Sequence, residues 1–275
     1  MSGQLFRGFD CDGRTSHKVR TRPMVHRIND FVVDLDKWRD HEAAADFGKW
    51  TEANVINKLL ASNISHLYCE YCGEKGSETK RSCGMSCYTE FKKAFIPHSG
   101  RVIDIKRHSD SEMRYGVFVR PRSKITACEY IGEYLGELVP IGSKTSRYMF
   151  QNQSRVFEVD AERKGNWTRF INSHCVPNVK VWSTMCGKRH MLLLQTTRDI
   201  EEKEELYISY GRSYFESLGI LCCCSAQDEP HLPPLVPTDI TDTTDTADTT
   251  DATDVTDVTD NTDTTGTTVR EDEHE

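Results

Sequence analysis

The chain has 275 residues, of which 37 % are hydrophobic and 28 % charged, enough apolar material for a substantial core without disulfide staples. Its net charge of -8 is uneven: from Thr238 onward ten Asp and three Glu face one Arg, so that segment carries -12 and residues 1–237 carry +4. So small a positive charge does not predict nucleic-acid binding. No apolar run approaches the roughly 18 residues that span a bilayer, and residues 1–7 hold no apolar signal core. We therefore expect a nucleocytosolic protein with no membrane partner, whose cysteines are thiols or metal ligands.

Residues 1–100 are expected to form a helical and cysteine-rich N-terminal region. Between Asp40 and Ala61 apolar residues recur at roughly helical intervals, which predicts one packing helix. Its apolar positions are Phe47, Trp50, Val55, Ile56, Leu59 and Leu60.

Two closely spaced cysteine pairs follow within this region. Each pair can supply two adjacent corners of a tetrahedron, and the polar stretch between them is loose enough to bring the pairs together. The spacing predicts a structural zinc site, with four unligated thiols as the alternative. The expected ligands are Cys69, Cys72, Cys83 and Cys87. Three other cysteines have no partner pattern and are expected to be ordinary small residues: Cys11, Cys128 and Cys186.

From Arg101 to Leu221 the sequence changes to short β-type runs separated by turn residues. The runs cover residues 117–119, 130–135, 156–159, 179–182, 191–194 and 206–208. Many short strands with loop-rich connections predict a mostly β domain in which loops carry the chemistry.

One segment in this region is more specific than strand patterning. Residues 165–178 read GNWTRFINSHCVPN and follow Asp160-Ala161; they resemble the DA…GN..RFINHSC.PN signature of SET-domain protein lysine methyltransferases, with His and Ser exchanged. Four further motifs resemble the family pattern in the family's order: YGVF at 115–118, EYIGEYLGE at 129–137, YMF at 148–150, and RDI with EELYISYG at 198–211. The resemblance covers residues 101 to 224.

The resemblance implies a mostly β fold with some α structure, the β-clip SET fold, in which residues 205–210 thread past residues 169–178 in a pseudoknot. The expected organisation is the N-terminal zinc-binding region over 1–100, a SET domain over 101–221, a post-SET-like segment over 222–237, and a Thr- and Asp-rich tail over 238–275. Aspartate falls at every third position from Asp239 to Asp263. Because almost nothing large and apolar accompanies it, the tail is expected to be disordered, as a solvating segment or a docking strip for basic partners.

Methyl transfer from S-adenosylmethionine to a lysine amine requires the sulfonium, methyl and nitrogen to align. The amine must also be neutral, although free lysine has a pKa of about 10.4; a narrow aromatic channel beside a cation disfavours the ammonium. By resemblance, Tyr210 is the catalytic tyrosine, and Tyr134 and Tyr148 line the lysine channel. Taken singly, each would be read as a half-buried strand tyrosine.

The resemblance also assigns residues to the methyl donor. Tyr115 and Gly116 match the loop whose main chain holds the methionine part, and Asn172 with Ser173 matches the pair that binds the adenine side. Arg169 is either a donor-binding or a structural residue.

Four positions depart from the family pattern. Arg114 replaces the entry glycine, Ser173-His174 inverts the usual order, and Ser209 replaces an Asp before the catalytic tyrosine. Ile208 stands where the family has Phe or Tyr, and its missing hydroxyl is expected to favour higher methylation.

A second zinc site is suggested near the C-terminal cysteines. Cys222 and Cys224 point the same way in an extended segment, and the resemblance brings Cys175 to them. The family's next cysteine is Glu229 here. Either His231 is the fourth ligand or the site is degenerate.

The leading hypothesis is an S-adenosylmethionine-dependent protein-lysine N-methyltransferase with structural zinc. We expect a histone substrate, chromatin as the setting and the nucleus, with the cytoplasm as an alternative; the oligomeric state is left open. The second hypothesis is a catalytically weak SET protein that acts as a chromatin scaffold or peptide-binding module.

Overall fold

The computed structural model describes residues 7–9, 16–18, 25–76, 83–95, 99–108, 115–143, 146–151 and 154–234. Three predictions from the sequence concern residues outside these ranges, namely those for Arg114, Cys11 and the tail over 238–275. The described residues belong to one unit of the chain, Met1–Asp239. Among them, every helix is too short and too polar to cross a membrane.

The N-terminal part contains short elements and one longer helix. They are β1 (Arg7–Phe9), β2 (Ser16–Lys18), β3 (His26–Arg27), β4 (Val32–Val33), the 3₁₀ helices η1 (Leu35–Trp38) and η2 (Glu42–Asp46), and α1 (Glu52–Leu60). The single helix predicted from Asp40 to Ala61 is wrong in its first half. Gly48 adopts a left-handed φ of 68° and breaks the segment after η2. Thr51 then caps α1, its hydroxyl accepting a hydrogen bond from the Asn54 amide at 3.4 Å.

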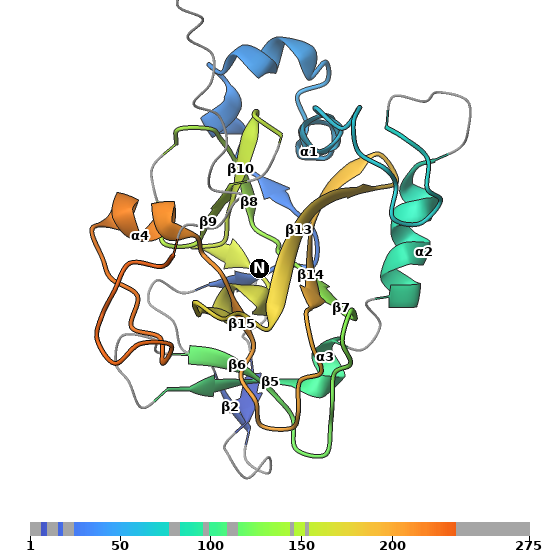
Figure 1. Cartoon of the computed structure of the whole chain (residues 1–275). Helices are drawn as coiled ribbons and strands as arrows, with labels where there is room; N and C mark the ends of the chain where they lie inside the picture. The colour runs from blue at the N-terminus through green and yellow to red at the C-terminus, as the bar shows by residue number, and fades with distance from the viewer. Residues whose placement is uncertain are drawn as a thin grey trace, which may run out of the picture. The chain divides into compact units, whose positions relative to one another are not determined.

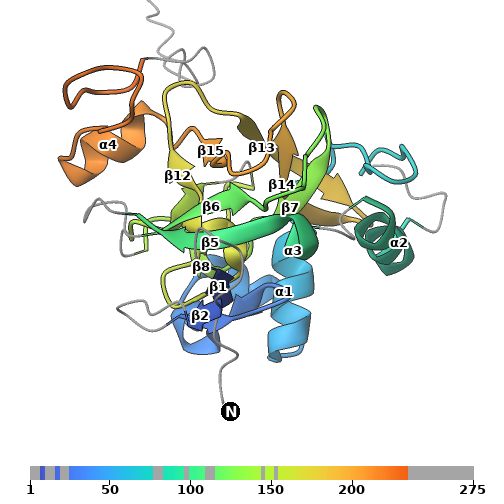
Figure 2. The same cartoon turned by 90° about the horizontal axis from the view of Figure 1, so that it is seen from below.

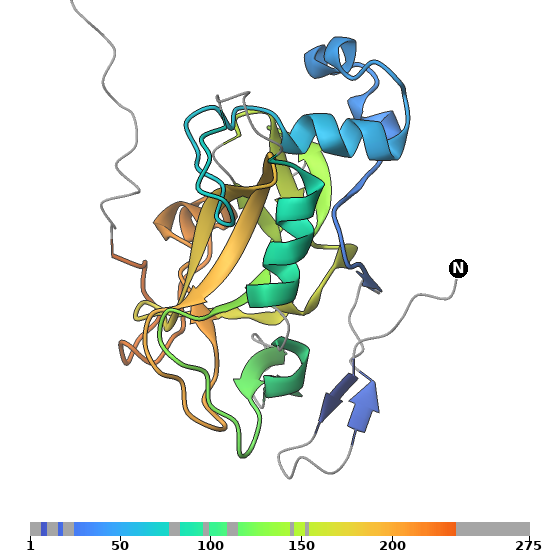
Figure 3. The ribbon, with the colours of Figure 1, turned by 90° about the vertical axis from the view of Figure 1, so that its right-hand side faces the viewer.

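Two helices follow, α2 (Met85–Phe95) and the short α3 (Ser99–Val102). Cys87 lies in the first turn of α2, so one expected zinc ligand is part of this helix. Phe91 is fully buried, and Figure 3 shows α2 lying along the hairpin that β13 forms with β14. Sequence patterning did not predict α2.

The remainder is mostly β, as the strand pattern predicts. Its elements are β5 (Ile103–Arg107), β6 (Tyr115–Val119), β7 (Tyr130–Glu133), β8 (Glu137–Pro140), β9 (Met149–Gln151), β10 (Phe157–Asp160), β11 (Lys164–Gly165), η3 (Trp167–Phe170), β12 (Asn172–Ser173), β13 (Val179–Cys186), β14 (Arg189–Thr196), β15 (Tyr207–Ile208) and α4 (Arg212–Leu218). All six predicted strand runs are confirmed.

These strands form several small sheets instead of one large one. The order is β4-β8-β10-β9 in the largest and β13-β14-β7 in the next, while β5-β6, β12-β15 and β3-β11 are pairs. Figure 1 shows the long β13–β14 hairpin beside β7, and Figure 2 shows β5 against β6. Strand β14 is buried almost throughout because both of its faces pack on apolar side chains: Leu192 and Leu194 belong to one core cluster, and Met191 and Leu193 to another. The N-terminal part is anchored by Trp38, which is fully buried and donates from its indole to the Leu138 carbonyl at 3.1 Å.

The predicted crossing of two distant segments is present. β12 and β15 pair in parallel, with Asn172 opposite Tyr207. Asn178, 2 % exposed, joins the segments with its side chain: the amide nitrogen donates to the Glu205 carbonyl at 2.8 Å, and the amide oxygen accepts from the Tyr207 amide at 2.8 Å. Because both backbone groups are satisfied by one side chain, the segments are held in a fixed register.

Candidate active site and metal centres

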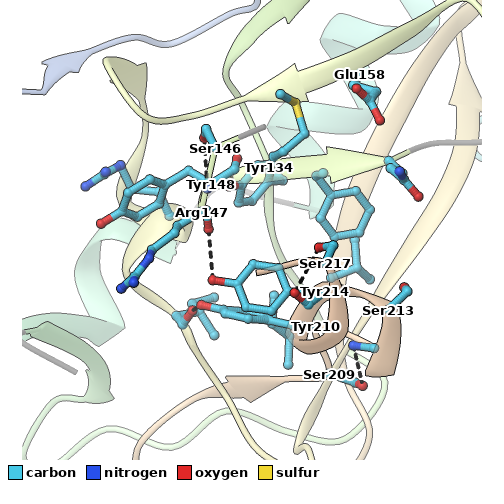
Figure 4. Close-up of a pocket in the computed structure, with 18 of the residues that line it drawn as sticks. Tyr134, Ser146, Arg147, Tyr148, Glu158, Ser209, Tyr210, Ser213, Tyr214 and Ser217 are labelled. Carbon is cyan, nitrogen blue, oxygen red and sulfur yellow. Dashed lines mark hydrogen bonds between the residues drawn. The ribbon is translucent and has the colours of Figure 1, made fainter. Parts of the chain in front are cut away.

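A cavity of about 990 Å³ opens beside this crossing. Figure 4 shows aromatic side chains gathered in it. The lining includes Tyr134, Tyr148, Arg169, Ile208, Tyr210 and Tyr214. All three tyrosines expected to form the catalytic channel therefore face one cavity, although 76 residues separate the first from the last in sequence. Tyr214, on α4, was not anticipated from the sequence.

Two of the three channel phenols donate a hydrogen bond to a backbone carbonyl. The hydroxyl of Tyr210 donates to the Ile171 carbonyl at 2.7 Å, and that of Tyr134 donates to the Tyr148 carbonyl at 2.8 Å. Burial raises the pKa of Tyr210 well above its usual value of 10.0 and likewise raises the pKa of Tyr134. Both phenols therefore stay protonated at neutral pH, so they act as hydrogen-bonding groups and not as bases.

The aromatic cluster continues onto α4. The rings of Tyr210 and Tyr214 meet edge to face, with centroids 4.7 Å apart, an arrangement that favours ring packing. Tyr214 donates to the Arg147 carbonyl at 3.3 Å. The start of α4 thus packs against the ring of Tyr210.

Arg169 brings a positive charge into the cavity. Its Nε donates to the Ala161 carbonyl at 2.8 Å, and its guanidinium lies 4.0 Å from the centroid of the Tyr148 ring. Nη1 is buried and has no hydrogen-bond partner among the described residues. Since a buried unpaired donor is costly, this N–H is suited to an anionic group of a ligand, such as the carboxylate of S-adenosylmethionine.

The other four residues expected at the donor do not line this cavity. Instead, the Asn172 amide donates to the Tyr115 carbonyl at 3.0 Å and to Glu205 at 2.9 Å. Gly116 packs so closely on the same carboxylate that a Cβ there would lie 2.2 Å from Glu205 Oε1. The Ser173 hydroxyl accepts from the Tyr210 amide at 3.2 Å. Asn172 and Gly116 therefore lie against one buried carboxylate, Tyr115 is joined to Asn172, and Ser173 contacts the catalytic candidate.

Glu205 is a second residue that the sequence analysis did not assign to the site. Its side chain is 6 % exposed, and its carboxylate also accepts from the Tyr207 hydroxyl at 2.7 Å and meets His108 Nε2 at 2.9 Å. The carboxylate links His108, which follows β5, to Gly116 on β6, Asn172 on β12 and Tyr207 on β15. The paired Glu204-Glu205 in the last motif was the available signal.

Three of the departures from the family pattern can be followed in the structure. Ile208 is 3 % exposed and lines the cavity, so its side chain sets part of the cavity's width. His174 keeps a main-chain role, its amide donating to the Ile208 carbonyl at 3.0 Å. Its ring packs on Tyr207 with centroids 4.9 Å apart. Ser209 also lines the cavity.

The first cysteine group gathers as its spacing predicts. The ligand atoms of Cys69, Cys72, Cys83 and Cys87 lie within 4.8 Å of one another, compatible with a tetrahedral zinc whose ligands stand about 3.8 Å apart. Burial raises the pKa of the Cys69 thiol, but amide hydrogen bonds, first that of Gly187, outweigh it and bring the pKa to about 7. Cys186, expected to be ordinary, lies 3.9 Å from Cys69 Sγ to Sγ.

The second group is complete, with histidine as its fourth member. The ligand atoms of Cys175, Cys222, Cys224 and His231 lie within 4.8 Å of one another. Nε2 of His231 is 3.1 Å from Cys175 Sγ. Its Nδ1 faces the Glu229 carbonyl at 2.9 Å, the outer contact that directs the other ring nitrogen to a metal. Both groups fit structural zinc.

Comparison with known proteins agrees with this geometry. The family model described as SET domain matches residues 19–211, more than half of the chain. The human "Histone-lysine N-methyltransferase EHMT1" is 33 % identical over 104 residues, covering 35 % of this chain and 8 % of that protein. "Histone-lysine N-methyltransferase mes-4" of Caenorhabditis elegans is 29 % identical over 206 residues, covering 63 % and 21 %. The chain thus spans less than a quarter of the length of either relative.

Among solved structures, a crystal structure of KRYPTONITE in complex with DNA, an H3 peptide and SAH aligns with a TM-score of 0.36 and 25 % identity. The alignment covers 40 % of this chain and 23 % of that one.

Proposed function

Because the chain belongs to the SET-domain family, we propose that it is an S-adenosylmethionine-dependent protein-lysine N-methyltransferase. The observation that carries the proposal is the convergence of Tyr134, Tyr148 and Tyr210 on one cavity at the β12–β15 crossing. Function is argued from this site and not from the fold alone.

When bound, the cofactor would supply a methyl group carried on a sulfonium, and its sulfur would be left as a neutral thioether after the methyl group passes to a lysine amine. Two features support binding of the cofactor. The first is the free Nη1 of Arg169, which is suited to a charge-assisted hydrogen bond with a carboxylate. The second is the contact between β6 and β12 at Tyr115, Gly116 and Asn172. Ser173 supports the site through its contact with the Tyr210 main chain.

The channel residues would act on the lysine amine by position and environment. Tyr210 and Tyr134 present protonated phenols whose oxygens retain acceptor capacity, so they can orient the amine. The rings of Tyr148 and Tyr214 exclude water, and desolvation beside a cation lowers the pKa of the amine toward its reactive neutral form. Holding the amine in line supplies a further large part of the rate.

Both metal centres are proposed to be structural zinc sites. The first joins α2 to the β13–β14 hairpin, and the second fixes residues 222–231 to Cys175 beside β12. We propose the domain boundaries 1–100, 101–221 and 222–237, with β3 and β4 of the first region adding strands to β11 and β8 of the second. We propose a histone lysine as substrate, chromatin as partner and the nucleus as location, because both relatives are named as histone-lysine N-methyltransferases.

The test is transfer of labelled methyl groups to a panel of core histones. We expect label on one histone, and we expect Tyr210→Phe to reduce turnover by about 100-fold or more, the effect of losing one positioned hydrogen bond at a reacting centre, while donor affinity by calorimetry stays within about threefold. Tyr68→Phe is the matched control, because Tyr68 is 60 % exposed and outside the cavity.

Two outcomes would contradict the proposal. Unchanged turnover in Tyr210→Phe would remove the catalytic role of that residue. No labelled histone together with no donor binding would remove the enzyme, and histone-peptide binding in that case would favour the scaffold hypothesis.

A further inference from the structure

Strand β7 (Tyr130–Glu133) ends immediately before the channel residue Tyr134, and it is an edge strand. Among the described strands, only β14 pairs with it, and that ladder is interrupted by a register shift. The Asn166 side chain adds one hydrogen bond to the Glu133 carbonyl at 2.7 Å. Because an interrupted ladder on one side fixes a strand less firmly than two complete ladders, side-chain contacts have a larger share in positioning β7.

The first end of β7 is bonded to a residue that directly follows a ligand of the first cysteine group. Glu70 comes after Cys69 in the sequence, and its Oε2 accepts a hydrogen bond from the Tyr130 hydroxyl at 3.0 Å. Its Oε1 accepts from the Thr184 hydroxyl on β13 at 2.6 Å. Because both carboxylate oxygens are engaged, Glu70 joins the metal-binding loop to two strands of the sheet.

The last residue of β7 is bonded in a similar way. Tyr88 comes directly after Cys87 on α2, and its hydroxyl donates to Glu133 Oε2 at 3.1 Å. Lys92, one turn further along α2, donates to the same oxygen at 3.2 Å and to the Tyr88 oxygen at 3.1 Å. The Glu133 side chain is only 2 % exposed, so water cannot readily replace these donors. Successive side chains of an extended segment point to opposite faces: Glu133 is bonded to α2, and the next residue, Tyr134, lines the cavity.

We infer that the first cysteine group positions the lysine channel: the hydroxyls of Tyr88 and Tyr130 join β7 to the metal-binding segments and thereby fix Tyr134 for methyl transfer. The inference rests on the proposed methyltransferase function and adds to it two positioning residues outside the cavity. Burial raises the pKa of Tyr88 and of Tyr130, so both phenols stay protonated and can donate. Precise placement matters at Tyr134, because a displacement of about 1 Å in a reacting site can cost about 100-fold in rate.

The experiment uses the full chain with zinc bound and three substitutions of tyrosine by phenylalanine, each of which deletes one hydroxyl and keeps the ring. Tyr88→Phe and Tyr130→Phe remove the two bonds to β7. Tyr71→Phe is the matched control, because Tyr71 lies between the ligands Cys69 and Cys72 but is 47 % exposed.

Four measurements separate positioning from a general loss of structure. Metal analysis gives the zinc content, and urea unfolding gives the stability. Calorimetry with S-adenosylhomocysteine gives the number of donor sites per chain, which corrects kcat for any inactive fraction. Fluorine NMR of 3-fluorotyrosine introduced only at position 134 reports the surroundings of that ring without any methyl transfer.

We expect Tyr88→Phe and Tyr130→Phe each to lower kcat per donor site by about tenfold, and the double variant to lower it further. The KM for a lysine peptide should stay within about threefold, with the zinc content and the number of donor sites unchanged. The fluorine resonance at position 134 should shift or broaden in both variants. Tyr71→Phe should leave the resonance and kcat as they are in the natural protein.

The outcomes distinguish the inference from the proposed function. If the natural protein transfers methyl groups and kcat per donor site is unchanged in both variants, the inference is overturned and the proposed function stands. Loss of zinc together with loss of donor sites would reduce the two hydroxyls to a structural role and would also overturn the inference. A resonance at position 134 that responds to both variants, in a protein that transfers no methyl group, would support the positioning of Tyr134 and contradict the proposed function.

Discussion

Asn178 is a buried side chain that bonds two backbone groups across the crossing of β12 and β15, which makes Asn178→Ala an informative stability variant. The substitution removes both the donor to the Glu205 carbonyl and the acceptor for the Tyr207 amide, each at 2.8 Å. Because Asn178 is only 2 % exposed, water cannot readily replace it. Each buried group left unpaired costs about 1–3 kcal/mol, so the free energy of unfolding should fall by about 2–6 kcal/mol. Domains of ordinary size have only about 5–15 kcal/mol in total.

Urea unfolding in zinc-containing buffer measures this loss. With an m-value of about 3 kcal/mol/M, the midpoint should move down by about 0.7–2 M. Asn57→Ala is the matched control, since Asn57 is exposed on α1 and its loss should change stability by no more than about 0.5 kcal/mol. A loss below about 1 kcal/mol for Asn178→Ala would refute the view that this amide holds the two segments together.

Three further substitutions test separate parts of the account. His231→Ala should lower the zinc content from two equivalents toward one by metal analysis, because it removes the fourth ligand of the C-terminal group; unchanged zinc content would exclude His231 as a ligand. Gly116→Ala should destabilise the protein by about 1–3 kcal/mol in urea, since its Cβ would lie 2.2 Å from the buried Glu205 carboxylate; wild-type stability would mean that this contact yields easily. Ile208→Tyr, which adds a hydroxyl to the cavity wall, should shift the methylated lysine product toward fewer methyl groups by mass spectrometry, and an unchanged product distribution would contradict a role for Ile208.

Local patterns predicted the strands well and the helices poorly. The six predicted runs form strands because each is a short stretch of apolar residues bounded by turn residues. The helix expected from Asp40 fails at Gly48, whose left-handed φ no periodicity reveals. Helices α2 and α4 have only 11 and 7 residues, lengths that are marginal in isolation. They depend on contacts with distant parts of the chain, which a local pattern does not contain.

The site shows the same division between local and distant information. Motif order was enough to select Tyr134, Tyr148 and Tyr210, and cysteine spacing was enough to select the first metal group. The role of Glu205 depends on His108, Asn172 and Tyr207, which only the folded chain brings near. Motif position also grouped Tyr115 with the donor-binding residues, but it did not reveal that Tyr115 lies outside the tyrosine-lined cavity.

The central claim is that the tyrosine-lined cavity receives a lysine amine. A crystal structure with S-adenosylhomocysteine and a lysine peptide bound tests it most directly. The account predicts the peptide's lysine nitrogen between the hydroxyls of Tyr210 and Tyr134, with its chain against the ring of Tyr148. A lysine side chain bound outside this cavity, with the three tyrosines untouched, would contradict it.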